Sequence, residues 1–181
     1  FLSTDNASDL GNFAKVNPPI RGELDRRAMM AALKRGRLDT FGSDHAPHTK
    51  VQKEQDYWDV PSGLPGVGTM FPLILGALKN GRISLESMVS MCAEVPAKLF
   101  NLVGKGAIEE GADADLVLFR EGVRTKLTQP MVTSHCGWSP FLGREVGLPP
   151  DIVMVGGQIA AREGILMDDL QPGKAVQYSN R

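Results

Sequence analysis

Alternating strand and helix signals fill the first hundred residues, but they yield only two strand–helix pairs. Residues 14–17 are predicted to end a short strand, because Pro18 and Pro19 cannot continue a hydrogen-bonded ladder. Residues 38–43 are predicted to form a second, buried strand. Two parallel strands cannot close an α/β domain, so either upstream sequence or a partner chain must cover the remaining strand edge.

The helices follow from apolar spacing and from capping residues. A helix over residues 23–35 begins with acidic residues, ends with Lys34 and Arg35, and is followed by Gly36 as a C-cap. The polar stretch 44–62 is longer than most connections, which usually marks function or mobility. Further helices are predicted over residues 67–78, 85–93 and 96–100.

After Gly104 the pattern changes to short strands, predicted over residues 114–119, 152–155 and 158–161. Gly156 and Gly157 between the last two are a strong signal for a hairpin. The predicted fold class is therefore α/β, with a boundary near residue 104. Since a (β/α)8 barrel typically needs about 250 residues, residues 1–104 would supply only its last βα units. Residues 105–181 would form a small β-rich module.

Composition excludes several classes of protein. The chain has 20 basic and 21 acidic residues, and they are spread evenly along it. The sequence therefore lacks the cluster of basic residues that binds nucleic acid or an anionic membrane. No apolar run approaches the length of a membrane span, and no signal peptide is visible. The two cysteines, Cys92 and Cys136, are too few for a disulfide scaffold. We expect a soluble, cytoplasmic protein.

Residues 42–48 carry the most informative chemistry, with Asp44, His45 and His48 close together. They follow a predicted parallel strand, at the end where the loops of α/β barrels form active sites. A carboxylate fixed there can hold a divalent cation or move a proton. The alternative is that Asp44 only caps the following turn, and a single motif often matches by chance.

Two other segments are predicted to reach the same mouth of the barrel. Asn17 ends the preceding strand, and residues 61–66 contain glycines that let the backbone approach a ligand closely. Backbone groups there could pair with the polar edges of an amide ring. The alternative for the Asn17 segment is a stiff loop start, and for residues 61–66 an ordinary proline and glycine turn before a helix; each explains its segment about equally well.

Together, the three segments resemble the dihydroorotases, a branch of the amidohydrolase superfamily. The strings KVNPPIR, GSDHAPH and PSGLPG occur in that family's order and spacing. DHAPH is the discriminating string, since the related hydantoinases and allantoinases usually carry Cys or Ser after DH. The resemblance extends through residues 111–119 and 139–143 to the closing hairpin. It implies the end of a TIM-type (β/α)8 amidohydrolase barrel in residues 1–104 and part of a flanking composite sandwich in residues 105–181.

The resemblance also implies a role for each of five site residues. Asp44 matches the aspartate that binds one zinc ion and carries the proton during ring opening and closure. His48 matches the histidine that contacts the substrate carboxylate, and Asn17 an asparagine that hydrogen-bonds the substrate. Ser62 and Gly63 match the backbone pair that holds the ring.

Other polar residues are expected to have structural roles. For His45 we expect an orienting contact in preference to metal ligation, and for Arg21 an ion pair that positions its loop. His135 and Cys136 are adjacent, so on a strand they would face opposite ways and would not chelate together. Trp138 is expected to anchor its segment against the barrel.

The implied activity is reversible, zinc-dependent hydrolysis of the cyclic amide of dihydroorotate to N-carbamoyl-aspartate, a step of pyrimidine biosynthesis. The family's remaining ligands for its binuclear zinc site belong to earlier strands and are not in this chain, so the chain alone is expected to be inactive. The missing N-terminal half of the barrel is its first expected partner.

Two alternatives stay open. One is a non-catalytic, dihydroorotase-like scaffold subunit for aspartate carbamoyltransferase, and the other is a hydantoinase or allantoinase acting on a related cyclic amide. Retention of Asp44, His48 and Asn17 favours an enzyme, because a scaffold has no need of them. A homo-oligomer is compatible with each of these hypotheses.

Overall fold

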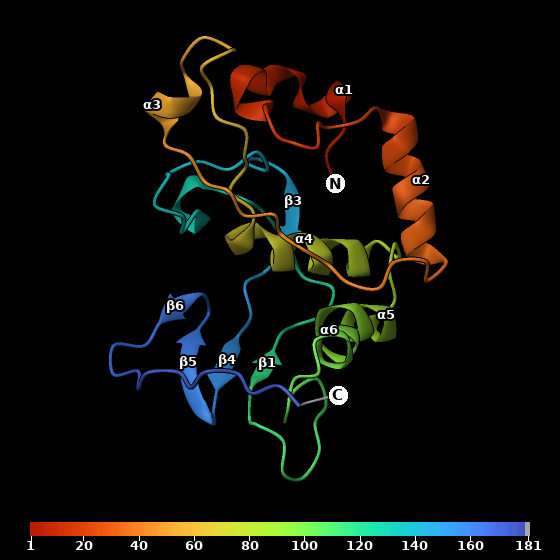
Figure 1. Ribbon diagram of the computed structural model, residues 1–181, viewed down its shortest axis with the longest axis vertical. Coiled ribbons are helices and arrows are strands. Elements are labelled where there is room, and N and C mark those ends of the chain that lie inside the picture. Colours follow the sequence, from red (N-terminus) through yellow and green to blue (C-terminus); the bar gives the residue numbers. More distant parts are fainter. Residues whose placement is uncertain (180–181) are drawn as a thin grey trace.

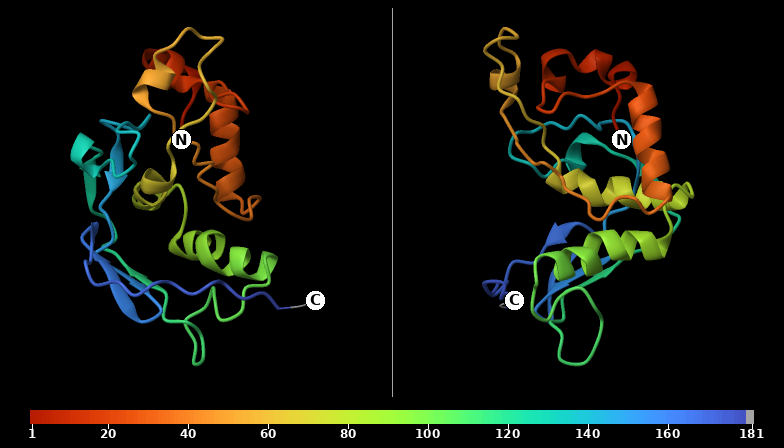
Figure 2. Two further views of the ribbon diagram at one scale, coloured as in Figure 1. Left: turned by 60° about the vertical axis from the view of Figure 1, so that its left-hand side comes forward. Right: turned by 45° about the vertical axis from the view of Figure 1, so that its right-hand side comes forward.

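Helices and strands are separated along the chain, as the computed structural model of residues 1–179 shows (Figure 1). Among these residues the α-helices lie within the first hundred, and the strands lie between Leu116 and Leu166. Figure 2 shows a curved, open arrangement in which the strands run along one side and the helices along the other. No helix in the described part of the chain is both long and apolar enough to span a membrane.

Helix α2 (Glu23–Lys34) confirms the predicted helix and its end. Gly36 follows it in the left-handed conformation, with φ of 63°. The Gly36 N–H donates to the Leu33 carbonyl at 3.1 Å, and the Arg37 N–H donates to the Ala32 carbonyl at 3.0 Å. These two bonds satisfy carbonyls that the end of a helix otherwise leaves unpaired, which is why glycine is favoured there.

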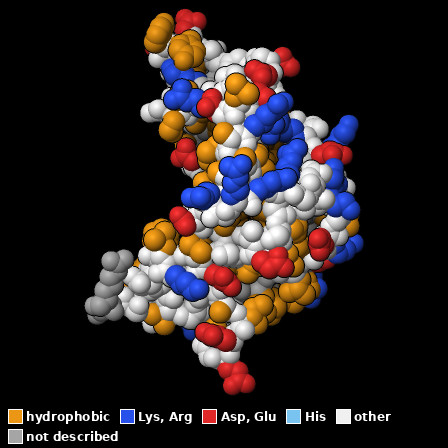
Figure 3. Space-filling model, turned by 90° about the vertical axis from the view of Figure 1, so that its right-hand side faces the viewer, with side chains coloured by type: hydrophobic (Ala, Val, Ile, Leu, Met, Phe, Trp, Pro, Cys, Tyr) orange, Lys and Arg blue, Asp and Glu red, His pale blue; other side chains and the backbone are white. Residues whose placement is uncertain are grey.

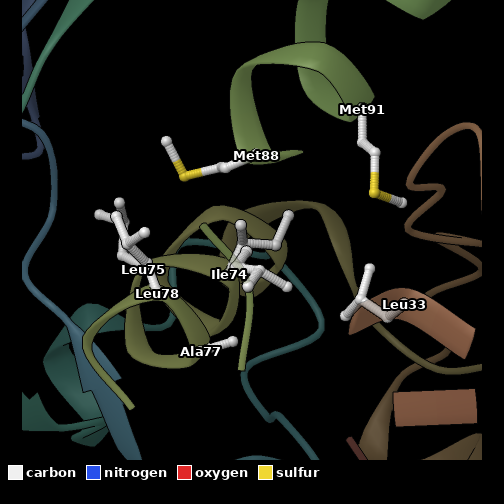
Figure 4. Close-up of a cluster of buried hydrophobic side chains, with 8 residues drawn as sticks. Leu33, Ile74, Leu75, Ala77, Leu78, Met88 and Met91 are labelled. Carbon is white, nitrogen blue, oxygen red and sulfur yellow. The ribbon is translucent and has the colours of Figure 1, made fainter. Parts of the chain in front are cut away.

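Helix α4 (Val67–Lys79) forms the centre of the core and confirms the helix predicted over residues 67–78. Its Ile74 is completely buried and meets Met88 and Met91 from the next helical stretch, as Figure 4 shows. Burying such a side chain stabilises the fold by about 1.5–3 kcal/mol. The buried members of this cluster are Leu33, Ile74, Leu75, Ala77, Leu78, Ile83, Met88 and Met91.

The helices predicted over residues 85–93 and 96–100 form one continuous stretch. It consists of α5 (Leu85–Val89), a π-helical turn (Ser90–Glu94) and α6 (Val95–Leu99). In a regular α-helix the Pro96 ring would clash with the carbonyl four residues earlier, which gives a physical reason for the wider turn.

The two strands predicted in the first half are wrong. A 3-10 helix (Ser8–Ala14) follows α1 (Thr4–Ala7), and residues 15–17 are irregular. Residues 38–43 form no ladder, and the nearest pairing is a single parallel bridge between His45 and Leu64. A parallel strand exists only through bonds to its neighbours, and residues 1–179 do not supply a neighbouring strand for either segment.

A four-stranded antiparallel sheet lies at one end of the molecule (Figure 1). Its order is β1-β4-β5-β6. The predicted hairpin is confirmed, since Gly156 and Gly157 adopt positive φ values of 55° and 81°, which a tight two-residue turn of this kind requires. The strands are β1 (Leu116–Leu118), β4 (Ile152–Val155), β5 (Gln158–Arg162) and β6 (Ile165–Leu166).

A separate ribbon of β2 (Arg124–Lys126) and β3 (Glu145–Gly147) packs against α4. The contact is close, because a Cβ at Gly147 would lie 2.3 Å from the Leu75 Cβ. Val146 beside it is fully buried. Residues beyond 104 therefore pack directly on a helix of the first part. Both the division near residue 104 and the composite sandwich stay predictions.

Basic side chains gather across the middle of the face that carries α2 (Figure 3). On α2 itself, Arg26 and Arg27 both donate to the Glu23 carboxylate, and these hydrogen bonds lower the pKa of Glu23 to about 2. Arg144 donates to the carbonyls of Phe1 and Asn6. The Glu23 pairs therefore lie within α2, whereas Arg144 holds the first residues of the chain against the segment before β3.

Candidate active site

The three segments singled out in the sequence lie side by side. The Gly63 N–H donates to the Lys15 carbonyl at 3.1 Å, and the Ala46 N–H donates to the Leu64 carbonyl at 3.0 Å. Residues 63 and 64 thus lie between the other two segments and bond to both. The structure therefore brings the predicted site segments into one group through backbone hydrogen bonds.

His48 and Ser62 are in direct contact. The His48 Nε2 atom lies 3.2 Å from the Ser62 carbonyl oxygen. Because a carbonyl only accepts hydrogen bonds, Nε2 carries the proton in this contact. Two residues predicted to bind the substrate are therefore neighbours, and the Ser62 carbonyl orients the imidazole of His48.

Gly63 is buried and lies directly against the segment that contains His48. Its φ is 150°, and a Cβ built on it would lie 2.4 Å from the Ala46 carbonyl oxygen and 3.0 Å from the His48 Nε2. Real side chains do not make contacts as short as the first of these. Glycine is therefore required for the backbone at residue 63 to pass this close to the predicted substrate-binding histidine.

Asp44 is exposed at the start of the same segment. Its φ of 45° lies in the left-handed region, which is uncommon for residues other than glycine but which aspartate and asparagine tolerate best. Within residues 1–179 its carboxylate accepts no hydrogen bond and forms no ion pair, so it is open to a ligand. Strained conformations of this kind cluster at active sites.

Asn17 and Arg21 lie on the exposed surface of their loop. The described residues provide neither a side-chain hydrogen bond that ties Asn17 to the other predicted site residues nor an ion pair for Arg21. The expected ion pair of Arg21 stays a prediction. The loop is held instead through its backbone, where the Arg21 carbonyl accepts the Thr4 N–H at 2.9 Å.

His45 caps the start of α4. Its Nδ1 atom accepts the backbone N–H groups of Gly66 at 3.0 Å and Val67 at 3.2 Å. The first N–H groups of a helix lack carbonyl partners, so the imidazole satisfies donors that would otherwise be free. The Nδ1 lone pair is used in this way, which agrees with the expected orienting contact and leaves the Nε2 proton exposed.

Trp138 joins the later part of the chain to the site. Its ring is buried, and its Nε1–H donates to the His48 carbonyl at 2.8 Å from ninety residues away in sequence. The ring also packs edge-on against Phe13, with centroids 4.9 Å apart. Trp138 thus anchors its segment as expected, and it holds the backbone of His48 in place.

Replacing Trp138 with phenylalanine is expected to destabilise the protein. Phenylalanine keeps a ring for Phe13 but has no N–H, so the His48 carbonyl loses its partner. Leaving such a group unpaired costs about 1–3 kcal/mol. Chemical unfolding measures this loss. The matched control is Trp58→Phe, at a residue that is 88% exposed. Equal stability of the two variants would argue against the anchoring role.

Lys53 was missed by the sequence analysis. It belongs to the one-turn helix α3 (Lys50–Lys53), inside a stretch predicted to be a polar loop. The side chain is fully buried, and its ammonium bonds to three backbone carbonyls of the site segments. No local signal distinguishes a buried lysine in such a stretch from a solvated one.

The described residues do not fit a zinc site by themselves. Within residues 1–179 no group of three or more His, Cys, Asp or Glu side chains could hold a metal ion. A catalytic zinc ion takes about three protein ligands. Asp44 is open, but His45 caps a helix through Nδ1 and His48 bonds to Ser62. Cys136 contacts Ser134 and the Trp138 carbonyl, so its thiol packs locally.

The fold defines the class of protein. The chain is similar in structure to the L-hydantoinase (dihydropyrimidinase) from Arthrobacter aurescens, with a TM-score of 0.84 and 34% sequence identity. The match covers 92% of this chain and 38% of that one. The α/β arrangement described above is therefore also found in part of this L-hydantoinase.

The sequence then gives the family. The family model described as the amidohydrolase family matches residues 20–160, and the chain belongs to that family. It is 44% identical over 157 residues to a dihydroorotase from Halobacterium salinarum, covering 87% of this chain and 37% of the relative. It is 36% identical over 176 residues to a dihydroorotase from Methanosarcina mazei, covering 96% and 38%. These relatives confirm the resemblance to dihydroorotases, and the chain spans less than two fifths of their length.

Proposed function

We propose that this chain is the C-terminal part of a dihydroorotase, which hydrolyses the cyclic amide of dihydroorotate reversibly to N-carbamoyl-aspartate in pyrimidine biosynthesis. The observation that carries the proposal is the geometry around DHAPH. The exposed Asp44 shares a short segment with His48, which packs against the Ser62 and Gly63 backbone. The dihydroorotase relatives support the same substrate class.

Each of these residues has a task suited to a cyclic amide. The ring presents N–H and C=O edges. The Gly63 N–H already donates to the Lys15 carbonyl, but the Ser62 N–H could pair with a ring C=O, and the Ser62 and Gly63 carbonyls each keep a second lone pair for a ring N–H. His48 and Asn17 would hold the acidic side of the substrate and fix its orientation. Asp44 would accept a proton from the attacking water and pass it to the departing ring nitrogen as the amide bond breaks. In the reverse direction the same carboxylate would take the proton back as the ring closes.

We further propose that the complete enzyme requires a binuclear zinc site, to which this chain contributes Asp44. The described residues supply too few ligands for such a site, so the remaining ones would come from polypeptide outside residues 1–181. The expected division is a barrel portion in residues 1–104, completed by an N-terminal half, and a β-rich module in residues 105–181. The assembled enzyme would work in the cytoplasm, as a homo-oligomer or beside aspartate carbamoyltransferase.

A hydantoinase is the second candidate, and the similarity to L-hydantoinase favours it. The two activities differ in substrate, since a hydantoin ring lacks the carboxylate of dihydroorotate. Ala46 in the DHAPH string favours the dihydroorotase. An inactive scaffold is disfavoured because Asp44, His48 and Asn17 are all present.

The test is a hydrolysis assay with zinc on the complete polypeptide that contains these residues, using dihydroorotate, hydantoin and dihydrouracil in parallel. We expect kcat/KM to be highest for dihydroorotate, and residues 1–181 alone to be inactive. A preference for hydantoin would establish the second candidate. A folded, zinc-loaded protein that hydrolyses none of the three would contradict the enzyme hypothesis.

A further inference from the structure

Lys53 is a charged side chain with no access to solvent. Its relative exposure is 0%, and its Nζ atom lies 3.0 Å from the Lys15 carbonyl, 3.0 Å from the Pro61 carbonyl and 3.3 Å from the Gly63 carbonyl. An ammonium group has three N–H donors, so each donor has one acceptor. Lysine is almost never fully buried unless it is paired. Here the partners are backbone dipoles, and no carboxylate of residues 1–179 lies within ion-pair distance.

The three carbonyls belong to the two loops that would hold the substrate. Lys15 lies two residues before Asn17 on the first loop, and Pro61 and Gly63 flank Ser62 on the second. The Gly63 N–H also bonds directly to the Lys15 carbonyl. The ammonium therefore holds the backbone at Ser62 and Gly63 against the loop that carries Asn17.

The position of Lys53 depends in turn on the segment of His48. Thr49, the residue after His48, caps helix α3: its side chain accepts the Gln52 N–H at 3.3 Å, and its N–H donates to the Gln52 side chain at 2.9 Å. This reciprocal cap fixes the single turn that ends at Lys53. The Lys53 nitrogen thus bonds to two of the predicted substrate-binding segments, and its own helix follows the third.

We propose that Lys53 is a positioning residue of the substrate site, whose ammonium sets the placement of the Ser62 and Gly63 backbone relative to Asn17. It touches no substrate, so its effect is on binding geometry. The proposal deepens the function proposed above, and it rests on that function for the identity of the ligand.

The neighbouring lysine does not share this role. The Lys15 ammonium donates to the Tyr57 carbonyl at 2.6 Å and lies 4.6 Å from the centre of the Tyr57 ring. Burial lowers the pKa of Lys53, and the positive charge of Lys15 lowers it further. Burying an ammonium group costs free energy unless it is hydrogen-bonded. The presence of one here therefore favours a function for its three hydrogen bonds.

The test is Lys53→Met in the complete polypeptide, with Lys50→Met as the matched control on the same turn. Methionine keeps an unbranched stem and removes all three donors, whereas Lys50 is exposed. We expect KM for the hydrolysed cyclic amide to rise at least tenfold, with kcat changed less than about threefold and zinc content unchanged. Unchanged KM in a folded Lys53→Met variant, or a fall in kcat alone, would overturn the proposal.

Two further measurements keep the result decisive. If Lys53→Met does not fold, Lys53→Arg is judged by the same criterion, because its planar guanidinium keeps the charge but does not match three convergent carbonyls. Hydrogen–deuterium exchange over residues 61–66 gives a readout independent of activity, and we expect at least tenfold faster exchange than in Lys50→Met. Faster exchange in a protein that hydrolyses no cyclic amide would support the role of Lys53 while rejecting the proposed function. Equal exchange in both variants would reject the role itself.

Discussion

Asp44→Asn is expected to lower kcat of the complete enzyme by roughly 10²–10⁴-fold, the range typical of removing a general acid–base group. The amide has nearly the same shape as the carboxylate, but it cannot accept and return the proton. Asparagine also tolerates the left-handed backbone that residue 44 adopts, with φ of 45°. The substitution therefore tests the chemistry of the carboxylate with little change to the loop. Steady-state kinetics with dihydroorotate measure the effect.

The matched control for this experiment is Asp39→Asn, at another exposed aspartate just before the site. It should leave kcat within about twofold, in line with surface substitutions. Zinc content has to be measured for both variants, because Asp44 is proposed to be a ligand as well as a proton carrier. A folded Asp44→Asn enzyme that retains zinc and more than a tenth of its activity would rule out the proton-carrying role.

Gly63→Ala should reduce kcat/KM by about 10²-fold, the cost of misplacing a substrate by about 1 Å. The new methyl group would lie 2.4 Å from the Ala46 carbonyl oxygen, so one of the two backbone segments has to move. Both segments carry predicted substrate-binding residues, and the movement therefore reaches the site directly. Substrate titrations that separate KM from kcat measure the effect.

Gly156→Ala is the control that distinguishes the effect of this steric clash from the effect of placing alanine at a positive φ. Gly156 also has a positive φ, of 55°, but an added Cβ there meets no atom within 4 Å. Its substitution should cost stability, by about 1 kcal/mol, and leave kcat/KM unchanged. If Gly63→Ala behaves like Gly156→Ala, the close approach of residue 63 to the His48 segment has no part in substrate binding.

Much of the fold was predictable where the signals are local. Helix α2 has its apolar spacing and a terminal glycine within fifteen residues, and the Gly156–Gly157 hairpin is defined by two adjacent residues. The strands predicted over residues 14–17 and 38–43 failed for the opposite reason. A parallel strand is defined by distant neighbours, and its own sequence says only that it is short and apolar.

The candidate site likewise has residues with a local sequence signal and residues without one. The resemblance to dihydroorotases predicts Asp44, His48, Asn17, Ser62 and Gly63 as site residues from strings of adjacent residues. Lys53 and Trp138 support these residues through contacts with backbone carbonyls, to which any residue type can contribute. Because every residue has a backbone carbonyl, the sequence does not indicate which carbonyls accept these bonds. Only the three-dimensional structure shows that one lysine of a polar loop is fully buried and that one indole reaches His48.

The helix cap formed by His45 makes the site accessible to spectroscopy. The chain has only three histidines, and two of them, His45 and His48, belong to the same short segment. Each of the two is held by a hydrogen bond to a different ring nitrogen, Nδ1 in His45 and Nε2 in His48. Their ¹⁵N resonances would therefore differ from those of the exposed His135, and a spectrum of the three imidazoles would show directly whether these loops are assembled in residues 1–181 in solution.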